Sequence, residues 1–333
     1  MEKINANSIT LKIHDDRELA TAKFHVSEVI GNRILLERGK LLIVGEPKAR
    51  KSFLLDQTAF ELAYGRQWLN SGYIPQPRRV LIFALEEWAE SFAEREQKLL
   101  AGLKLTKALD GAVKMVESPP LPLTDTSVQS AIIQTIERTK PDVVCFDPFY
   151  MINDKDENSA TEVAKTFHVL DSWQRAYGFT SIVVHHTKKA QFDNYGAPID
   201  MGFGSVRGSI QFIAWPENIL LVDVKGKEPN QSFKMYGKNR RGRSLPETVL
   251  TFDDSTMVAT LHAEEAGQTD ATLRVSDVLK SHRRLMLASE IQTLTGLSNG
   301  AVHNALNLLE SQKRASNEVD SKDKRIRRWK GVS

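Results

Sequence analysis

The sequence has little of what several classes of protein need. It contains one cysteine, Cys145, among 333 residues, which rules out an intramolecular disulfide framework and a zinc site built from several cysteines. No apolar run reaches the roughly 18–20 residues of a membrane span, and the polar first 20 residues lack the apolar core of a secretory signal. Since 41% of the residues are hydrophobic, we expect a globular protein of a reduced, cytoplasmic setting without membrane contact.

A strong net charge is missing as well. The 45 basic and 42 acidic residues leave a formal charge of +3. The basic residues gather in two stretches: residues 225–243 hold seven Lys and Arg against one Glu, and residues 270–333 hold twelve against seven Asp and Glu. Such local stretches on a near-neutral chain favour patches for a polyanion. The alternative is that they are solvated loops and a frayed tail.

Apolar runs alternate with helix-like segments along most of the chain. We expect strands at 40–44, 79–85, 113–118, 142–152 and 180–189, and helices at 53–65, 86–103, 127–141 and 161–178. This alternation indicates an α/β fold with a mainly parallel sheet that helices cover on both faces. Four later strand-like runs, at 218–224, 232–239, 247–253 and 257–263, lack helices between them and predict an antiparallel edge.

The length and the breaks in this pattern predict more than one domain. Residues 1–38 form a weakly patterned lead-in, and residues 39–263 form the α/β domain. A polar linker covers 264–271, and a small helical domain covers 272–333.

A phosphate-binding loop follows the first expected strand. The segment reads Gly45, Glu46, Pro47, Lys48, Ala49, Arg50, Lys51 and Ser52, followed by Phe53, close to the pattern G-x-x-x-x-G-K-[ST]. In this motif, backbone N–H groups above a helix start point at phosphates, the lysine neutralises them, and the hydroxyl holds Mg²⁺. The sequence therefore predicts a nucleotide and Mg²⁺ at this loop.

Arg50 occupies the position where the pattern has its second glycine. The backbone amide survives this change, but a side chain now stands close to the nucleotide. Arg50 is tolerated if its dihedral angles are already near helical, and otherwise it hinders binding. Both readings stay open at the level of the sequence.

Polar side chains follow three of the expected strands. Glu86 and Glu87 come after 79–85, Asp147 lies within 142–152, and His185 and His186 lie within 180–189. Because the carboxyl ends of parallel strands share one edge of a sheet, the three carboxylates can reach the loop of Lys51. Neighbouring side chains on a strand face opposite ways, so one histidine is expected at the site and the other in the packing.

In combination these segments resemble RecA-like P-loop ATPases of the RepA type, the hexameric replicative helicases of plasmids and phages. The resemblance covers residues 40–243, about 60% of the chain. It is carried by the segments 41–69, 79–87, 142–152, 181–189, 205–209 and 234–242.

The resemblance implies roles for individual residues. Lys51 and Ser52 would hold ATP and Mg²⁺, and Asp147 would hold Mg²⁺. Glu86 would orient the attacking water, with Glu87 as a substitute, and His186 would be the polar sensor at a strand end.

The resemblance also implies an assembly. Lys238 and Arg240 correspond to a pair that is inserted into the active site of the neighbouring subunit, which implies a homo-oligomer, either a ring or a filament, with a ring of about six subunits expected. Arg207 lies where the family presents loops that contact DNA or couple the sites. Residues 1–38 would contact a neighbouring subunit.

The C-terminal segment predicts three helices, at 272–282, 286–296 and 298–312, followed by a basic two-stranded segment at 314–331. This order of helices and strands resembles a winged helix-turn-helix domain. Such a domain would contact single- or double-stranded DNA through Asn299, His303, Asn304, Lys313, Arg314, Arg325, Arg327 and Arg328. The alternative is a helical domain that mediates protein contacts.

Two functions follow from these features. The first is an oligomeric, ATP-hydrolysing protein that acts on DNA, a helicase, translocase or replication ATPase of a mobile element or phage. The second is a DNA-binding regulator or adaptor in which ATP controls assembly and little ATP is hydrolysed; Arg50 and the C-terminal domain favour it. A metabolic kinase is disfavoured, because the sequence shows no lid and no acceptor site.

Overall fold

The computed structural model describes most of the chain. The described residues are 13–21, 27–70, 72–105, 110–187, 191–192, 198–199, 202–225, 232–242, 244–262, 270–282, 284–297, 299–311, 315–319 and 327–331.

Within these ranges, one nine-stranded sheet organises the larger part of the chain, in the order β13-β12-β11-β10-β3-β7-β6-β4-β5. The strands from β10 to β5 in this order run parallel, whereas β11, β12 and β13 pair antiparallel. The predicted α/β core with a mainly parallel sheet and an antiparallel edge is confirmed. Its strands are β3 (Lys40–Gly45), β4 (Val80–Ala84), β5 (Val113–Glu117), β6 (Val143–Asp147), β7 (Thr180–His186), β10 (Asn218–Lys225), β11 (Ser232–Asn239), β12 (Thr248–Phe252) and β13 (Ala259–His262).

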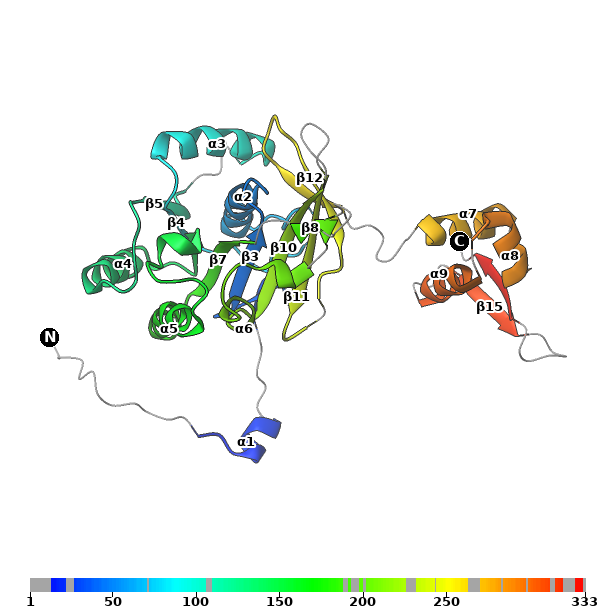
Figure 1. Ribbon diagram of the computed structural model, residues 1–333, viewed down its shortest axis with the longest axis horizontal. Helices are drawn as coiled ribbons and strands as arrows, with labels where there is room; N and C mark the ends of the chain where they lie inside the picture. Colours follow the sequence, from blue (N-terminus) through cyan, green and yellow to red (C-terminus); the bar gives the residue numbers. More distant parts are fainter. Residues whose placement is uncertain are drawn as a thin grey trace.

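Helices cover both faces of this sheet (Figure 1). On one face lie α2 (Lys51–Ala63) and α3 (Ala89–Gly102), and on the other lie α4 (Thr126–Thr139), α5 (Ala160–Tyr177) and α6 (Gln211–Ala214). Two apolar clusters fill the space between sheet and helices, one on each face. Strands that are buried on both faces explain why their sequences are continuous apolar runs instead of alternating ones.

Strand β6 is shorter than predicted. The sequence predicted a strand to residue 152, but β6 ends at Asp147 and a 3₁₀ helix, η1 (Phe149–Met151), follows. Pro148 separates them, and a proline has no N–H to donate to the sheet. Phe149 is fully buried in the core, so its apolar side chain made a helical turn look like the end of a strand.

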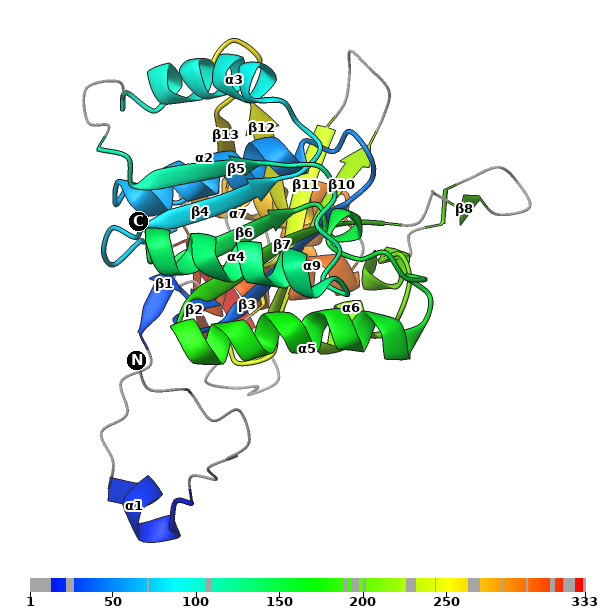
Figure 2. The ribbon, with the colours of Figure 1, turned by 90° about the vertical axis from the view of Figure 1, so that its left-hand side faces the viewer.

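Smaller elements lie before β3 and between β7 and β10 along the chain. The lead-in contains α1 (Asp16–Thr21), β1 (Glu28–Ile30) and β2 (Leu35–Leu36), and the segment after β7 contains β8 (Gln191–Phe192), β9 (Pro198–Ile199) and η2 (Gly202–Ser205). Figure 2 shows β1 and β2 beside the start of β3.

The C-terminal part has a core of its own. Buried side chains of Val275, Ile291, Leu306 and Trp329 belong to one apolar cluster. The elements are α7 (Asp270–His282), β14 (Met286–Leu287), α8 (Ala288–Thr295), α9 (Asn299–Ser311), β15 (Ala315–Val319) and β16 (Arg327–Gly331), and the three strands pair in the order β14-β16-β15.

Candidate functional site

The loop at residues 45–52 connects β3 to the start of α2. A side chain at Gly45 would bring its Cβ within 2.7 Å of the carbonyl oxygen of Val222, so only glycine fits there. Lys51 Nζ donates to the carbonyl oxygen of Glu46 at 2.8 Å, which bends the lysine back over the loop. Helix α2 begins without a side-chain cap, and its first N–H groups are therefore free to meet an anion.

Arg50 has φ 59° and ψ 27°, in the left-handed region, so the first of the two alternatives, a backbone near helical, does not hold. A left-handed conformation costs a residue with a side chain roughly 1–2 kcal/mol. The guanidinium pairs with Asp254 at 2.6 Å and lies 5.2 and 5.1 Å from the ring centres of Phe233 and Phe252. These contacts hold the side chain against the antiparallel edge of the sheet and offset the backbone cost.

Carboxylates from two strand ends meet Lys51 in one pocket. Asp147 ends β6, and Glu86 follows β4 by two residues. Burial lowers the pKa of Lys51 to about 8, although the negative charges of Asp147, Glu86 and Glu46 oppose that shift. The pocket has a volume of about 410 Å³ and is lined by Lys48, Arg50, Lys51, Ser52, Phe53, Glu86, Glu87, Asp147, His186, Asp254 and Met257.

The predicted Mg²⁺ ligands lie together in this pocket. Asp147 is buried, which raises the pKa of its carboxyl to about 6, and it accepts a hydrogen bond from Ser52. Among the described residues, no group of three or more His, Cys, Asp or Glu side chains could hold a metal ion by itself. Mg²⁺ is commonly held by one or two protein oxygens, waters and substrate phosphates, and Ser52 with Asp147 fits this arrangement.

The two histidines of β7 face opposite ways, as the alternation along a strand predicts. His185 is buried, stacks on Phe212 at 3.8 Å between ring centres, and its Nε2 contacts the carbonyl oxygen of Arg207 at 2.9 Å. His186 lines the pocket of Lys51. Burial, with Lys51 and Arg207 nearby, lowers the pKa of His186 to about 4, so its imidazole is neutral at pH 7.

A second pocket of about 860 Å³ adjoins the first, because Glu86 and His186 line both. Arg207 lies here and pairs with Glu157 at 3.4 Å. Tyr150, Glu157 and Asn158 also line this pocket, and our sequence analysis did not single them out. Tyr150 follows Asp147 closely at the same sheet edge, so the strand-end rule that identified Asp147 could also have identified Tyr150.

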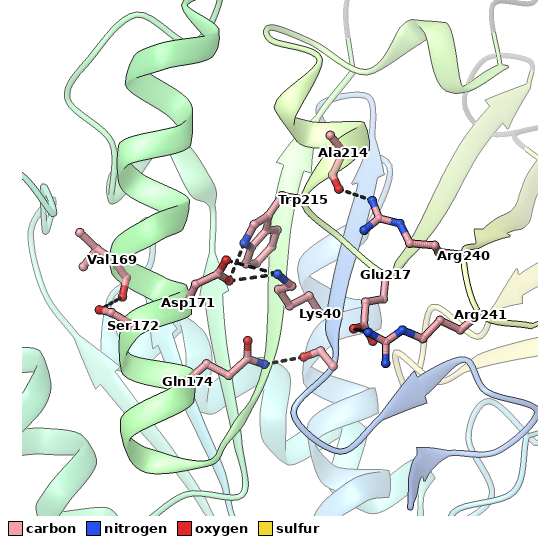
Figure 3. A network of polar contacts seen from close by, with 11 residues as sticks. Lys40, Val169, Asp171, Ser172, Gln174, Ala214, Trp215, Glu217, Arg240 and Arg241 are labelled. Atoms are coloured by element: carbon pink, nitrogen blue, oxygen red, sulfur yellow. Dashed lines mark hydrogen bonds and ion pairs between the residues drawn. The ribbon is translucent and has the colours of Figure 1, made fainter. Parts of the chain in front are cut away.

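Lys238 and Arg240 lie toward the end of the sheet at which β3 begins, whereas the P-loop follows the other end of β3. Lys238 pairs with Ile219 in β10, which pairs with Leu42 near the start of β3. Figure 3 shows the Arg240 guanidinium at the carbonyl oxygen of Ala214 and Arg241 at Glu217. Lys238 and Arg240 therefore do not reach the pocket of Lys51 within the same chain.

Glu87 and the turn after β12 contribute contacts to the site that could not be predicted from the sequence. Glu87 reaches the pocket, but its carboxylate pairs with Arg95 of α3. Asp254 and Met257 come from the turn between β12 and β13, and they enter the pocket about 200 residues after the P-loop along the chain. No motif marks such a contact between distant segments.

The predicted DNA-contact residues of the C-terminal part are only partly described. Asn299, His303 and Asn304 lie in α9, and Arg327 and Arg328 begin β16. His303, Arg327 and Arg328 are exposed. Lys313, Arg314 and Arg325 lie outside the described residues.

Comparison with known proteins agrees with the P-loop core. The family described as AAA domain matches residues 10–191, more than half of the chain. The chain belongs to the AAA domain family. The match includes the P-loop, Glu86, Asp147 and His186 and ends before Arg207, and it supports the assignment of this domain as a P-loop ATPase core that binds ATP.

Two further comparisons add little to this. No curated protein sequence matches the chain. Among solved structures, the chain is similar to a KaiC-like protein, PH0186, from the hyperthermophilic archaeon Pyrococcus horikoshii OT3, with 13% identity, a TM-score of 0.48, and coverage of 71% of this chain and 98% of that one. This likeness is too distant to carry a statement about function. None of the helices in the described parts of the chain has the length and apolar character needed to cross a membrane.

Proposed function

We propose that this protein is an oligomeric ATPase that hydrolyses ATP and acts on DNA, as the resemblance to RepA-type helicases implies. The observation that carries the hydrolysis is one pocket in which Lys51, Ser52, Asp147, Glu86 and His186 come together. Each comes from the loop or strand end at which P-loop ATPases place these groups.

The P-loop binds the triphosphate. The N–H groups at the start of α2 and the Lys51 ammonium face the phosphate oxygens, and Lys51 leaves the Glu46 carbonyl to do so. Ser52 and Asp147 would hold Mg²⁺, which when bound neutralises charge on the β- and γ-phosphates. Because a phosphate favours the charged lysine, ATP raises the pKa of Lys51 from about 8.

Glu86 orients the water that attacks the γ-phosphate. Its carboxyl lies close enough to Lys51 for the two charges to interact, while burial raises the pKa of the glutamate. His186 lies between the two pockets and donates an N–H to a γ-phosphate oxygen. Since its pKa is about 4, it acts as a neutral hydrogen-bond donor at pH 7 and not as a positive charge.

The positive charge for the transition state comes from a neighbouring subunit. Lys238 and Arg240 lie at the sheet edge opposite the P-loop, so a head-to-tail contact between subunits would bring them to the neighbour's site. A head-to-tail contact closes into a ring if the rotation allows it. This arrangement makes hydrolysis depend on assembly.

The C-terminal part is proposed as a winged-helix domain that contacts DNA. Its three helices and three-stranded sheet follow the order of that fold, and β16 presents exposed Arg327 and Arg328. Arginines of this kind neutralise DNA phosphates. Arg207, beside Glu86 and His186, is proposed to couple DNA contact to the nucleotide site.

The test is ATP hydrolysis by the purified protein with and without single-stranded DNA, with Lys51→Ala as the blank and Glu86→Gln as the second variant. We expect turnover that DNA stimulates, no turnover with Lys51→Ala, and ATP binding without turnover with Glu86→Gln. ATP binding by the wild type without turnover above the blank would refute the motor function.

Arg50 favours a second function, the ATP-gated DNA-binding regulator. A side chain stands where these ATPases have glycine, and it ties the P-loop to Asp254 and the antiparallel edge. In that case, DNA binding would depend on ATP and would survive Glu86→Gln unchanged.

A further inference from the structure

A buried group of charged side chains lies behind the P-loop, between α2 and α3. Arg95 of α3 pairs with Asp56 of α2 at 2.5 Å and with Glu87. The side chains of Arg95 and Asp56 are 10% and 2% exposed. The proposed chemistry uses neither Arg95 nor Asp56, although a buried arginine between two carboxylates is costly to form without a benefit elsewhere.

Arg95 is held in a fixed orientation. Its guanidinium lies 5.0 Å from the ring centre of Phe53 and 5.2 Å from that of Phe92. The planar fork of an arginine can donate to two carboxylates at once, which the single ammonium of a lysine does less well. Burial raises the pKa of the neighbouring Glu96 to about 9, so Glu96 is neutral at pH 7 and does not compete for Arg95.

The two partners of Arg95 lie close in sequence to residues from two different parts of the nucleotide site. Asp56 lies four residues after Ser52 on α2, and residues at this spacing share one face of a helix. Glu87 directly follows Glu86. Arg95 therefore joins the helix that carries Ser52 to the segment that carries the water-orienting glutamate.

We propose that Arg95 is a positioning residue that fixes Glu86 relative to the P-loop through Glu87 and Asp56. This inference rests on the proposed ATP hydrolysis. Arg95 does not line the pocket of Lys51, so its loss affects the placement of Glu86 and spares the groups that bind ATP. The segment 86–88, which precedes α3, becomes free to move when Arg95 is removed.

The kinetic test compares Arg95→Met with Lys98→Met, which breaks the exposed Lys98–Glu94 pair of the same helix. We expect Arg95→Met to lower kcat by between about tenfold and a hundredfold, because a misplacement of ~1 Å has such an effect. The KM for ATP should stay within about threefold, since ground-state binding is untouched. Arg95→Lys should recover part of kcat, and Lys98→Met should match the wild type.

A second measurement needs no turnover. Cys145 is fully buried and Trp88 is 72% exposed, so a nitroxide attached to Trp88→Cys labels the segment next to Glu87 selectively. We expect Arg95→Met to shorten the rotational correlation time of this label. The double variant Asp56→Asn with Arg95→Met leaves no unpaired charge at position 56 and should give the same result if Arg95→Met alone folds poorly.

The outcomes separate the two proposals. Label motion that is equal in Arg95→Met and Lys98→Met overturns the inference, because Arg95 then does not hold the segment. Freer motion with unchanged kcat also overturns it, because the segment then does not position Glu86. If the wild type hydrolyses no ATP above the Lys51→Ala blank, the proposed hydrolysis fails, and label motion alone then decides whether Arg95 holds the segment. Freer motion together with a lower kcat and a retained KM supports the inference.

Discussion

The side chains of the neighbouring residues Arg50 and Lys51 contact different parts of the protein. Lys51 turns back over the loop to the Glu46 carbonyl, whereas Arg50 reaches Asp254, Phe233 and Phe252 on the far strands. The positive charge of Arg50 is therefore paired within the protein. Its left-handed backbone keeps the shape that a glycine would give the loop.

We expect Arg50→Gly to leave nucleotide binding nearly unchanged. The substitution relieves roughly 1–2 kcal/mol of backbone cost and removes an ion pair and ring contacts of similar total size. The ATP dissociation constant should stay within about threefold, a difference below 1 kcal/mol, and Lys51→Ala should abolish binding. Titration with a fluorescent ATP analogue measures both, and tenfold tighter binding by Arg50→Gly would mean that the arginine obstructs the nucleotide.

Glu96 predicts a pH dependence of stability. Both of its carboxylate oxygens are buried without a hydrogen-bond partner, and burial raises its pKa from 4.5 to about 9. Between these values the unfolded chain releases the proton and the folded chain keeps it. The contribution of this residue to stability is thus complete below pH 4.5 and is lost as the pH rises toward 9, at up to about 1.4 kcal/mol per pH unit.

Glu96→Gln should remove this loss. We expect its gain in the free energy of unfolding over the wild type to be larger at pH 8 than at pH 5, as measured by urea denaturation. Glu94→Gln, an exposed change in the same helix, serves as the control. An equal difference at both pH values would show that Glu96 is ionised in the folded protein.

At the scale of elements, the parallel strands could be predicted from the sequence, but the side-chain contacts between the helices could not. The runs that became β3, β4, β6 and β7 are continuous and apolar because both faces of the sheet are covered. Their order in the sheet put Glu86, Asp147 and His186 beside Lys51. The ion pair of Arg95 with Asp56 escaped prediction because no motif marks either position, and only the packing of α3 against α2 brings the two side chains together.

Strand β11 supports a prediction about assembly. It ends at Asn239, and Arg240 just beyond it contacts the Ala214 carbonyl at the end of α6. We expect Arg240→Ala to bind ATP like the wild type and to lose turnover by about a hundredfold or more, as for arginine fingers. Arg241→Ala, which breaks the pair with Glu217 at the same end of the strand, should retain turnover.

Mixing subunits sharpens this test. An Arg240→Ala subunit keeps an intact P-loop, and a Lys51→Ala subunit keeps Lys238 and Arg240. A mixture of the two inactive variants should regain part of the wild-type turnover if the finger acts between subunits. Equal turnover of Arg240→Ala and wild type would show that the finger assignment is wrong.

At the scale of the whole molecule, the chain has separate cores. The α/β part has a cluster on each face of its sheet, and the C-terminal part packs around Val275, Leu306 and Trp329. The sequence predicted three C-terminal helices, and β14 replaces the first two residues of the second one. Two residues of extended chain at the start of a helix carry no periodic signal.

Deleting residues 270–333 should separate DNA affinity from catalysis. Because the C-terminal core shares no residue with the clusters around the sheet, we expect basal ATP turnover to persist. Affinity for DNA should fall at matched salt, and the salt dependence of binding should become weaker as phosphate contacts are lost. Unchanged affinity and an unchanged salt slope, measured by fluorescence anisotropy, would refute DNA binding by this part.

The contacts of β11 have a mechanical consequence. Phe233 near its start touches Arg50 of the P-loop, and Lys238 five residues later lies at the other edge of the sheet, about 17 Å away along extended chain. Hydrogen bonds to β10 along this whole length keep the strand from stretching. Strand β11 can therefore move only as a rigid unit. If the proposed ring forms, a shift of the P-loop on ATP binding would tilt β11 and so move Lys238, which the proposal assigns to the site of the neighbouring subunit.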